Sequence, residues 1–587
     1  MSRSCIAAAL LVAVAAACGP SDAGAANAPG TLPAGVASLG TVVDFALLDQ
    51  DGRLHRLSDY ADRSAVAILV QGNACPIVRN TLSAWKKARE LYESRGVAFL
   101  MLNANPQDDR AGIAEEAREF GIETPILIDD AQLVSRSLGI GRTAEVLVFT
   151  PRDRQLAYRG PVDDRLGYET QKPNASDEFL CNALDALLDG LPVAAAGSEV
   201  RGCLISDVDA SGDGVDAPSY AHDVAPILTA KCGACHRDGG IGPWSLDDHD
   251  TVSGWSAMIR ETILTRRMPP WHADTHIGRF ANDRSLRPEQ ARTLVRWIDA
   301  GAPRGEGPDP LVEAPLAAAP KWMLGEPDLV LTVPEQELPA TGLVEYRYED
   351  IELPFDRDVW VVAADLQPSN PKVLHHGFAI LDRPDRGRRR WMESLLARFT
   401  PGDVAQRFPE GSGVLVPAGS KLVMQLHYTT TGKPEVDRSE VGLYLADAPP
   451  EKTYRGKYVI DHKLAIPPGA QEYTTTRTMV FETEALLHTL QPHMHYRGRS
   501  ATYEAFYPDG SQEVLLSVPD YRFTWQNHYT FEEPLRIPAG TRIVCTATFD
   551  NSANNPDNPD PTAEVHWGLA SIDEMYIAHA YYTDADG

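Results

Sequence analysis

The sequence predicts a multidomain protein with an α/β domain, an all-α domain and two β-sandwich domains. The chain has 587 residues, which is more than a single hydrophobic core supports. Strand and helix patterns alternate in its first third, helical patterns occupy its middle, and alternating strands broken by Pro-Gly and Asn-Pro turns fill the remainder. Because 43 % of the residues are hydrophobic, each domain can bury a core of its own.

The charge and the cysteine content exclude several classes of protein. A formal net charge of −28 disfavours contact with nucleic acid or with an anionic membrane surface, since both recruit basic proteins. Eight cysteines scattered over the chain are too few for a disulfide scaffold. We therefore expect neither nucleic-acid binding nor a polybasic membrane contact.

Residues 1–17 have the pattern of an export signal, in which Arg3 precedes an apolar run of small residues. The Ala-Ala-Ala-Cys sequence that ends at Cys18 resembles a bacterial lipoprotein cleavage site, with Ala where Leu is usual, and ordinary cleavage nearby is the alternative. Residues 18–40, rich in Ala, Gly and Pro, predict a flexible tether. We expect an exported protein at the periplasm or surface of a bacterium, anchored through a lipid on Cys18.

Residues 41–200 predict the α/β domain. A helix pattern runs from Pro76 to about residue 95, and buried strand patterns cover residues 65–70, 97–102, 125–129 and 145–149. This arrangement resembles a thioredoxin-like redoxin domain, with Cys75 at the strand-to-helix turn where that family keeps its reactive cysteine. A helix N-terminus favours the thiolate, so the position suits thiol chemistry.

Departures from the family leave the role of Cys75 open. Val78 stands where a dithiol thioredoxin has its second cysteine, and Gly72 stands where a peroxiredoxin has Thr or Ser. Thr143-Ala144 replaces the Thr-Pro of the fold. Cys75 is a redox-active thiol, half of a structural disulfide, or a remnant without function, and an exported chain permits a disulfide. The candidate partners for Cys75 are Cys203 and Cys181.

After a linker at residues 201–218, residues 219–305 predict the all-α domain. Cys232, Cys235 and His236 have the Cys-x-x-Cys-His spacing that attaches a c-type haem, in which two thiols bond the porphyrin and the imidazole ligates the iron. The helix patterns around the motif resemble those of a small cytochrome c. The cofactor expected here is one covalently bound haem c.

The sixth iron ligand has several candidates. Met268 precedes two prolines, which hold the backbone extended and present the thioether. Met258, on a helical pattern, is the core-packing alternative, and His272 or His276 would give a bis-histidine iron. We expect Met268, because its thioether is presented in this way. A thioether ligand raises the haem potential, which fits the haem to pass electrons to copper. A second linker follows at residues 306–324.

Two β-rich halves, residues 325–450 and 451–583, predict the two sandwiches. In the second half, His493 and His495 alternate along a strand, so both side chains point to one face. Such a pair is commonly just a polar sheet surface, but two imidazoles on a rigid face also chelate a borderline transition metal. The histidines of interest in the first half are His375, His376 and His427.

These histidines, followed by an Asp-Glu-Met segment that ends at Met575, resemble the copper type II, ascorbate-dependent monooxygenases, the family of peptidylglycine and dopamine hydroxylases. The resemblance implies two copper ions, each held by its own set of ligands. The three-histidine set consists of His375, His376 and His427, and the His-Met set consists of His493, His495 and Met575.

Strand geometry adds a condition to the three-histidine set. Adjacent side chains on a regular strand face opposite sides, so His375 and His376 can share a site only if the strand ends or bulges there. In the family, the copper of the His-Met set activates O2 and cleaves the substrate C–H bond, while the other copper supplies the second electron across an open cleft. The resemblance implies the same division here.

The function implied is that of an exported copper-dependent monooxygenase, which hydroxylates a C–H bond of a small organic substrate with O2. Ascorbate is the usual donor of the family, and the fused haem predicts a path for electrons from another external donor. The alternative is a periplasmic electron-transfer or thiol-redox lipoprotein without monooxygenase turnover. A third hypothesis is a thiol peroxidase with the haem and copper domains as partners.

The residues implied around the His-Met set disfavour one class of substrate. In the peptide-amidating relatives, an Arg, an Asn and a Tyr bind the carboxylate of the substrate, and the matching positions here hold Gln491, Ile577 and His579. A half-buried carboxylate needs charge-assisted hydrogen bonds of about 1.5–3 kcal/mol each. We therefore expect a less charged, aromatic or aliphatic substrate rather than a glycine-extended peptide, with His579 still able to contact a small acid.

Overall fold

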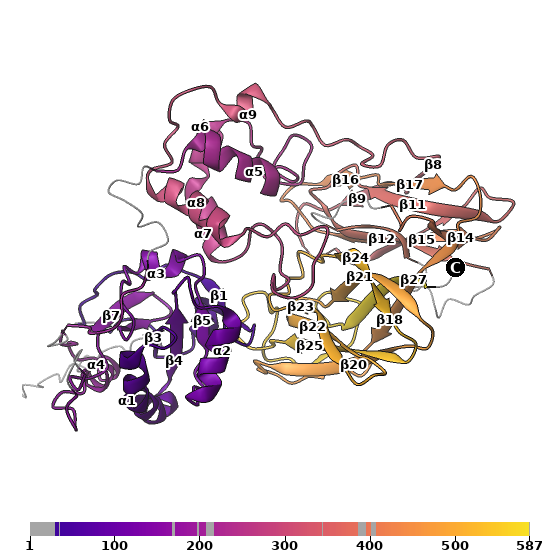
Figure 1. Cartoon of the computed structure of the whole chain (residues 1–587). Helices are drawn as coiled ribbons and strands as arrows, with labels where there is room; N and C mark the ends of the chain where they lie inside the picture. The colour runs from indigo at the N-terminus through magenta and orange to yellow at the C-terminus, as the bar shows by residue number, and fades with distance from the viewer. Residues whose placement is uncertain are drawn as a thin grey trace, which may run out of the picture.

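The computed structural model describes residues 30–33, 36–166, 171–195, 199–206, 217–342, 344–384, 395–400 and 407–585. It contains an α/β domain near the N-terminus, a helical segment above it in Figure 1, and a large β-sheet-rich region that ends the chain. The predicted export signal, Cys18 and most of the predicted tether lie outside the described residues. Within the described part, no helix is long and apolar enough to cross a membrane.

The α/β domain is built on a five-stranded sheet with the order β5-β4-β3-β6-β7. The strands are β3 (Ala65–Gln71), β4 (Val97–Asn103), β5 (Ile126–Ile128), β6 (Val146–Thr150) and β7 (Gln155–Gly160). β3, β4 and β5 are parallel, whereas β6 and β7 run antiparallel to their neighbours. Alternate residues of β3 enter two different hydrophobic cores, so the sheet is covered on both faces, and the α/β prediction is confirmed.

Helices cover both faces of this sheet. They are α1 (Pro76–Tyr92), α2 (Arg110–Glu119), α3 (Leu133–Ser137), α4 (Phe179–Leu188) and the short 3-10 helices η1 (Leu57–Tyr60) and η2 (Glu93–Arg95), next to a hairpin of β1 (Ala46–Leu48) and β2 (Leu54–Arg56). α1 and α4 pack on one face and α3 packs on the other. The first helix and its 3-10 extension end at Arg95, as predicted. Gly96 follows with a φ of 85°, a conformation that suits glycine.

The middle of the chain is helical. Its elements are η3 (Tyr220–Val224), α5 (Ala225–Lys231), α6 (His249–Gly254), α7 (Ser256–Leu264), α8 (Pro288–Asp299) and α9 (Pro310–Glu313). Leu228 of α5 meets Leu294 and Trp297 of α8 in a small core, as the apolar face of α8 predicts. The helices do not by themselves make an all-α cytochrome evident, so the haem domain stays a prediction.

The connection between α7 and α8, residues 265–287, lies against the β-rich region. Trp271 and Phe280 belong to the core of that region, and Phe280 forms an isolated antiparallel bridge with Phe531. The backbone N–H of Ala281 donates to the carbonyl of Thr530 at 2.8 Å. The helical segment is therefore attached to the β-rich region by a buried loop as well as by the chain that follows α9.

The first half of the β-rich region supplies β8 (Leu329–Thr332), β9 (Gln336–Leu338), β10 (Arg347–Glu352), β11 (Val359–Gln367), β12 (Leu374–Asp382), β13 (Leu395–Phe399), β14 (Ser412–Val416), β15 (Lys421–Tyr428), β16 (Glu435–Asp437) and β17 (Glu440–Leu445). A four-stranded sheet with the order β10-β15-β12-β13 packs over β11 and β17, and the interface between these two layers forms one core.

The second half supplies β18 (Lys452–Ile460), β19 (Ala465–Ile466), β20 (Tyr473–Phe481), β21 (Ala485–His493), β22 (Gly498–Phe506), β23 (Gln512–Val518), β24 (Tyr529–Ile537), β25 (Thr541–Phe549), β26 (Val565–His566) and β27 (Ile577–Asp584). Its four-stranded sheet, β20-β25-β22-β23, packs on β21 and β27. One eight-stranded sheet, β24-β21-β27-β18-β14-β11-β17-β8, contains strands of both halves and is joined by the parallel pair β14 and β18. The two predicted sandwiches thus share a sheet.

Ion pairs connect the α/β domain with the rest of the molecule. Arg110 of α2 donates to Asp274, on the loop between α7 and α8, at 2.5 Å, and the Asp274 side chain is 1 % exposed. Asp59 accepts from Arg499 of β22 at 2.6 Å, and Arg56 pairs with Asp520. These contacts hold the α/β domain against both the helical connection and the β-rich region.

Candidate functional site

The three-histidine set lies on two paired strands, β12 and β15. His376 is directly opposite His427, and the register shifts between Leu374 and His376. That shift is the strand irregularity which joint use of His375 and His376 requires. One ring nitrogen from each of the three histidines lies within 4.8 Å of those of the other two, and the Nδ1 atoms of His375 and His376 are 3.1 Å apart.

Burial prepares the three-histidine set for metal ligation. It lowers the pKa of His375 to about 4 and that of His427 to about 3, and it lowers the pKa of His376 well below its ordinary value. The imidazoles are therefore neutral, which is the form that ligates a metal. The Nδ1 atom of His427 is buried with no hydrogen-bond partner, as expected of an atom reserved for a ligand.

Aromatic and hydroxyl groups orient these rings. The hydroxyl of Tyr346 lies 3.2 Å from Nε2 of His376, and the Tyr346 ring stacks on His427 with the centroids 4.6 Å apart. The hydroxyl of Ser571, which is four residues before Met575, lies 3.4 Å from Nε2 of His427. The three-histidine set is therefore in contact with the segment that carries the predicted methionine ligand.

The two histidines of the His-Met set lie at the end of β21. Their ring centroids are 5.3 Å apart. Nδ1 of His493 lies 2.8 Å from the side-chain oxygen of Gln526, and Nδ1 of His495 lies 3.3 Å from the carbonyl of Asp573. These acceptors leave the Nε2 atoms to face a ligand, and Nε2 of His495 is buried with no hydrogen-bond partner.

A buried carboxylate fixes Met575 relative to the two histidines. Glu574 accepts from the backbone N–H groups of His495 and Arg497 and, at 2.9 Å, from that of Met575 itself. Burial raises the pKa of Glu574 to about 7, although these three hydrogen bonds act against the rise. The end of β21 and the start of β27 are thus clamped together, and Met575 is 7 % exposed.

Both sets border one apolar cavity of about 290 Å³. His376 represents the three-histidine set in its wall, and His493 and Met575 represent the His-Met set. Most of the remaining wall is apolar, and the described residues that line the cavity include no Lys, Arg, Asp or Glu. The other lining residues are Tyr346, Phe378, Ile380, Leu395, Gln425, Ile460, His462, Gln491, Trp567, Leu569, Ile577 and His579.

The two sets also meet on the ring of Phe523. Its centroid lies 4.9 Å from that of His375 and 5.7 Å from that of His495. Phe523, on the loop between β23 and β24, therefore contacts one ring of each set.

The cysteines and histidine of the predicted haem motif follow α5. Nδ1 of His236 lies 3.0 Å from the carbonyl of Trp244, which leaves Nε2 as the ligating atom. Burial lowers the pKa of His236 and raises the pKa of Cys232 to about 12, so both groups are neutral. Cys235 is half-buried and is a free thiol, as Cys232 is. The residues present therefore fit covalent attachment of a haem.

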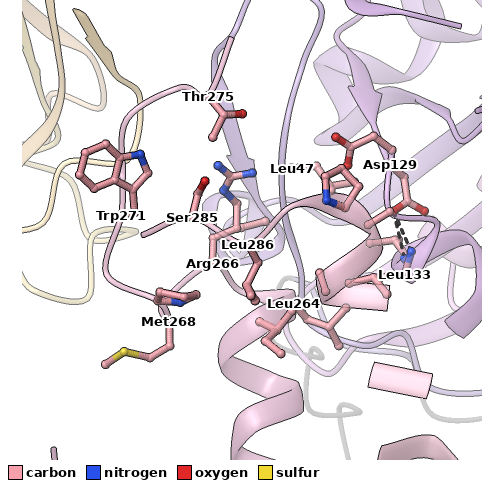
Figure 2. Close-up of a pocket in the computed structure, with 18 residues that line it drawn as sticks. Leu47, Asp129, Leu133, Leu264, Arg266, Met268, Trp271, Thr275, Ser285 and Leu286 are labelled. Carbon is pink, nitrogen blue, oxygen red and sulfur yellow. Dashed lines mark hydrogen bonds between the residues drawn. The ribbon is translucent and has the colours of Figure 1, made fainter. Parts of the chain in front are cut away.

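The candidates for the sixth iron ligand are spread over the connection after α7. Met268 borders a different pocket, between this connection and the α/β domain, and Figure 2 shows its sulfur directed away from Leu264 and the other labelled residues of that pocket. Met258 is 45 % exposed, so it does not pack in a core as the alternative reading expected. Nδ1 of His276 lies 3.1 Å from Asp274, whereas His272 is buried with neither ring nitrogen hydrogen-bonded.

The third candidate site surrounds Cys75 at the N-terminus of α1. Its sulfur lies 3.1 Å from the hydroxyl of Thr143 and 2.9 Å from the sulfur of Cys203. Of the two predicted partners, Cys203 is therefore the one in contact with Cys75, while Cys181 lies on α4. Burial alone raises the pKa of Cys75, but hydrogen bonds from Cys203 and Thr143 outweigh it and bring the pKa below the ordinary thiol value.

Comparison with known proteins identifies the class of this α/β domain. Residues 40–160 match the AhpC/TSA family. Together with the observed sheet, this establishes a thioredoxin-like redoxin domain. The match covers about a fifth of the chain and therefore assigns the domain rather than the whole protein.

Individual curated proteins and solved structures are similar to part of this chain. The chain is 30 % identical to thiol-disulfide oxidoreductase ResA of Geobacillus thermodenitrificans over 101 residues, which are 17 % of this chain and 56 % of that protein. A hypothetical protein from Sinorhizobium meliloti is 28 % identical, with 30 % of this chain and 97 % of that one covered and a TM-score of 0.25. Peroxidoxin BcpB from Mycobacterium tuberculosis is 16 % identical, with 26 % and 96 % covered and a TM-score of 0.20.

The chain thus spans about half the length of the curated relatives that it matches. The matches establish an oxidoreductase-type domain. They support the thiol-redox alternative. They do not test the monooxygenase hypothesis, because they concern the redoxin domain alone.

Several residues of these sites had no signal in the sequence. Phe523 and Gln526 lie in an irregular loop, where no periodicity marks them, and Tyr346 precedes a short strand. Glu574 stands inside the Asp-Glu-Met segment, so its position was visible although its role as a clamp was not. Only the fold brings these residues to the ligand sets.

Proposed function

We propose that the β-rich region is a copper-dependent monooxygenase that hydroxylates a C–H bond of a small organic substrate with O2. One observation carries the proposal: the clustered three-histidine set and the His-Met set border the same apolar cavity, the first through His376 and the second through His493 and Met575. Imidazole and thioether are ligands that suit copper, and a thioether favours its reduced state. Copper held by these sets would activate O2 and supply electrons for the hydroxylation.

The surrounding residues support this assignment by orienting the ligands and by lining the cavity with apolar groups. Gln526 holds the ring of His493, and the carbonyl of Asp573 holds that of His495. Such outer contacts fix the tautomer of a ligating histidine and typically account for a tenfold to hundredfold difference, roughly, in metal affinity. Phe523 stacks on His375, and most of the cavity wall is apolar.

The cavity favours a neutral, apolar substrate. Gln491, Ile577 and His579, which replace the carboxylate-binding residues of the peptide-amidating relatives, all line it. Burial lowers the pKa of His579 to about 3, so this side chain is uncharged and does not replace the missing cation. A carboxylate placed there would lose its hydration without a charged partner, whereas an aromatic or aliphatic group would bury apolar surface.

We further propose that electrons enter through a haem bound covalently at Cys232 and Cys235 and ligated by His236, with Met268 as the second axial ligand. The hydrogen bond from His236 to Trp244 supports the first assignment. Absorption spectra of Met268→Ala test the second: the variant is expected to bind carbon monoxide at a vacated sixth position. A reduced spectrum identical to that of the parent protein would transfer the role to another residue.

The decisive experiment for the monooxygenase is metal analysis together with product analysis. The protein loaded with copper is expected to hold two copper ions per chain and to consume O2 with formation of a hydroxylated product when a reductant and an apolar substrate are supplied. Copper binding without oxygen-dependent product would leave an electron-transfer protein. Zinc in both sites would overturn copper chemistry altogether, because zinc does not change its oxidation state. Export, with attachment through a lipid on Cys18, belongs to the same proposal.

A second function is favoured by a separate observation, the contact of 2.9 Å between the sulfurs of Cys75 and Cys203. We propose that the redoxin domain catalyses thiol–disulfide exchange with this pair, as the similarity to a thiol-disulfide oxidoreductase suggests. Mild oxidation of the full chain should remove two thiols and give a peptide that links Cys75 with Cys203. Retention of both thiols under oxidation that forms other disulfides would refute this function.

A further inference from the structure

The segment that carries Cys203 is bound to the redoxin domain as if it were an added strand. The backbone N–H of Cys203 donates to the hydroxyl of Thr143 at 2.9 Å, and the N–H of Thr143 donates back to the carbonyl of Cys203 at 2.9 Å. Two residues on, Ile205 donates to the carbonyl of Gly141 at 3.1 Å. Residues 202–206, here termed the linker strand, therefore hold Cys203 in register with the loop beside Cys75.

Two further contacts make this position specific. The amide of Gln132 donates to the carbonyl of Ser206 at 2.8 Å, and Arg142 donates to that of Gly202 at 3.1 Å. A side chain at Gly202 would place its Cβ 1.6 Å from the carbonyl oxygen of Thr143, so only glycine permits the close approach. The residue before Cys203 is thus adapted to the docked position of the linker strand.

The two sulfurs of the pair differ in access and in charge. Cys75 is 4 % exposed, whereas Cys203 is an exposed residue. Burial and the neighbouring sulfur of Cys75 raise the pKa of Cys203, whereas hydrogen bonds from Cys203 and Thr143 lower that of Cys75. The start of α1 adds a positive dipole end beside Cys75. The buried sulfur is therefore the one stabilised as a thiolate.

We propose that the pair is a dithiol–disulfide site with a fixed polarity, in which an external thiol attacks Cys203 and Cys75 is the leaving group. This inference rests on the second proposed function. Access selects which sulfur is attacked, and a leaving thiolate departs faster when its pKa is lower. Both criteria make Cys203 the attacked sulfur and Cys75 the leaving group. The attacked sulfur is therefore not Cys75, which occupies the position at which the family resemblance implied the reactive cysteine.

The exchange balances as follows. A thiolate R–S⁻ attacks the sulfur of Cys203, an R–S–S–Cys203 bond forms, the bond between Cys75 and Cys203 breaks, and its electron pair leaves on Cys75 as thiolate. A second thiol, within the same reductant, then attacks the R sulfur, forms its own disulfide and releases Cys203 as a thiol after taking up a proton. The partner is therefore a dithiol reductant, which is oxidised as the pair is reduced.

Glutathione, used as a probe, locates the attacked sulfur. The oxidised full chain is mixed with excess glutathione, quenched with acid, alkylated with N-ethylmaleimide and mapped by mass spectrometry. Glutathione is expected on Cys203 and N-ethylmaleimide on Cys75. Glutathione on Cys75 would overturn the proposed polarity while leaving the exchange function intact. Absence of any disulfide between the two residues in the oxidised chain would overturn both.

Single substitutions give a test that does not depend on trapping. With 5,5′-dithiobis(2-nitrobenzoate) as the probe, Cys75→Ser should react rapidly at Cys203. Cys203→Ser should react more slowly at Cys75, by about tenfold or more, because that sulfur is buried. Serine retains the hydrogen bond from position 203. Cys181→Ser is the matched control and should leave the difference unchanged. Equal rates at the two positions would refute the inference.

Gly202→Ala tests whether the linker strand provides the geometry. The added methyl group should displace the strand and reduce the effective concentration of Cys203 beside Cys75, so the equilibrium constant for forming the disulfide in a glutathione buffer should fall by about tenfold or more. Gly254, at the end of α6, where an added Cβ meets nothing within 4 Å, provides the control substitution Gly254→Ala. An equilibrium constant unaltered by Gly202→Ala would show that docking of the strand does not set the pairing.

Discussion

The ligand cavity of the β-rich region and the thiol pair of the redoxin domain are held together in different ways. The ligands of the cavity lie on or beside strands of continuous sheets. Gln526 and Tyr346 contact their rings, and Glu574 holds the backbone of Met575 and His495. In the thiol pair, Cys75 belongs to the folded domain but Cys203 belongs to a linker strand attached by a few hydrogen bonds.

This difference matches the chemistry proposed for each site. Metal ligands must stay within a fraction of an ångström of their geometry throughout turnover, so a rigid sheet is a suitable support. A disulfide-exchange site must let one sulfur move toward its partner, so a detachable strand is a suitable support for Cys203. Substitutions at the cavity should therefore change the rate of hydroxylation strongly and the rate of thiol–disulfide exchange weakly. Substitutions at the thiol pair should have the opposite effect.

The largest effect is expected for Met575→Ala. It removes the thioether from the His-Met set, so the rate of product formation should fall by more than about a hundredfold, since the reacting groups lose their alignment. The three-histidine set should still bind its copper, and metal analysis of the variant should find one ion instead of two. Met575→Leu, which keeps the apolar volume, is the matched control for the sulfur. Retention of activity in either variant would remove Met575 from the site.

A somewhat smaller effect is expected for Asp274→Asn, which breaks the ion pair between the redoxin domain and the connection packed on the β-rich region. Loss of one partner of a buried pair leaves Arg110 uncompensated and should lower the free energy of unfolding by about 3 kcal/mol. Thermal unfolding of the full chain at pH 7 measures the change. Asp250→Asn, at a carboxylate that is 100 % exposed, is the control. Equal destabilisation by the two substitutions would contradict the prediction.

The same pair gives the protein a defined acid sensitivity. Burial would raise the pKa of Asp274, but hydrogen bonds from His276 and Arg110 outweigh it and hold the pKa well below the ordinary value. A carboxyl whose folded-state pKa is depressed contributes stability above its unfolded pKa of about 4, and the contribution is lost as the pH falls further. Between about pH 5 and about pH 2, the free energy of unfolding of the parent protein should therefore fall by more than that of Asp274→Asn, which lacks this carboxyl.

Gln526→Leu should lower the copper affinity by about tenfold to hundredfold, because it removes the acceptor that orients His493. Competition with a copper chelator measures this change. Gln425→Leu alters the same cavity without contacting a ligand ring, since Gln425 donates to Tyr348, and it should leave the affinity unchanged. Equal loss in the two variants would mean that the cavity wall, and not the support of His493, sets the affinity.

The smallest effect is expected for Cys75→Ser on oxygen chemistry. The contacts of Cys75 are Thr143 and Cys203, both outside the β-rich region, so hydroxylation should continue at the parental rate while thiol–disulfide exchange is lost. Oxygen consumption and thiol exchange measured on the same preparation separate the two activities. A Cys75→Ser protein with intact fold and metal content but failed hydroxylation would show that the two regions are coupled after all.

The sequence by itself determined the α/β domain and the identity of the candidate ligands. Long buried strands and a helix of regular period are local patterns, so β3 and α1 could be predicted closely. Cys232, Cys235 and His236 form a local motif, and strand periodicity places His493 and His495 on one face. A strand irregularity at His375 and His376 follows from sterics alone once both are assigned to one site.

Only the tertiary structure decided which of these residues meet. The choice of Cys203 over Cys181 depends on where the linker strand docks, and the helical segment could not be predicted to insert Trp271 and Phe280 into a core of the β-rich region. The cavity arises where strands far apart in the chain converge, and Phe523 contacts one ring of each ligand set. Such contacts depend on long-range packing, which local periodicity does not encode.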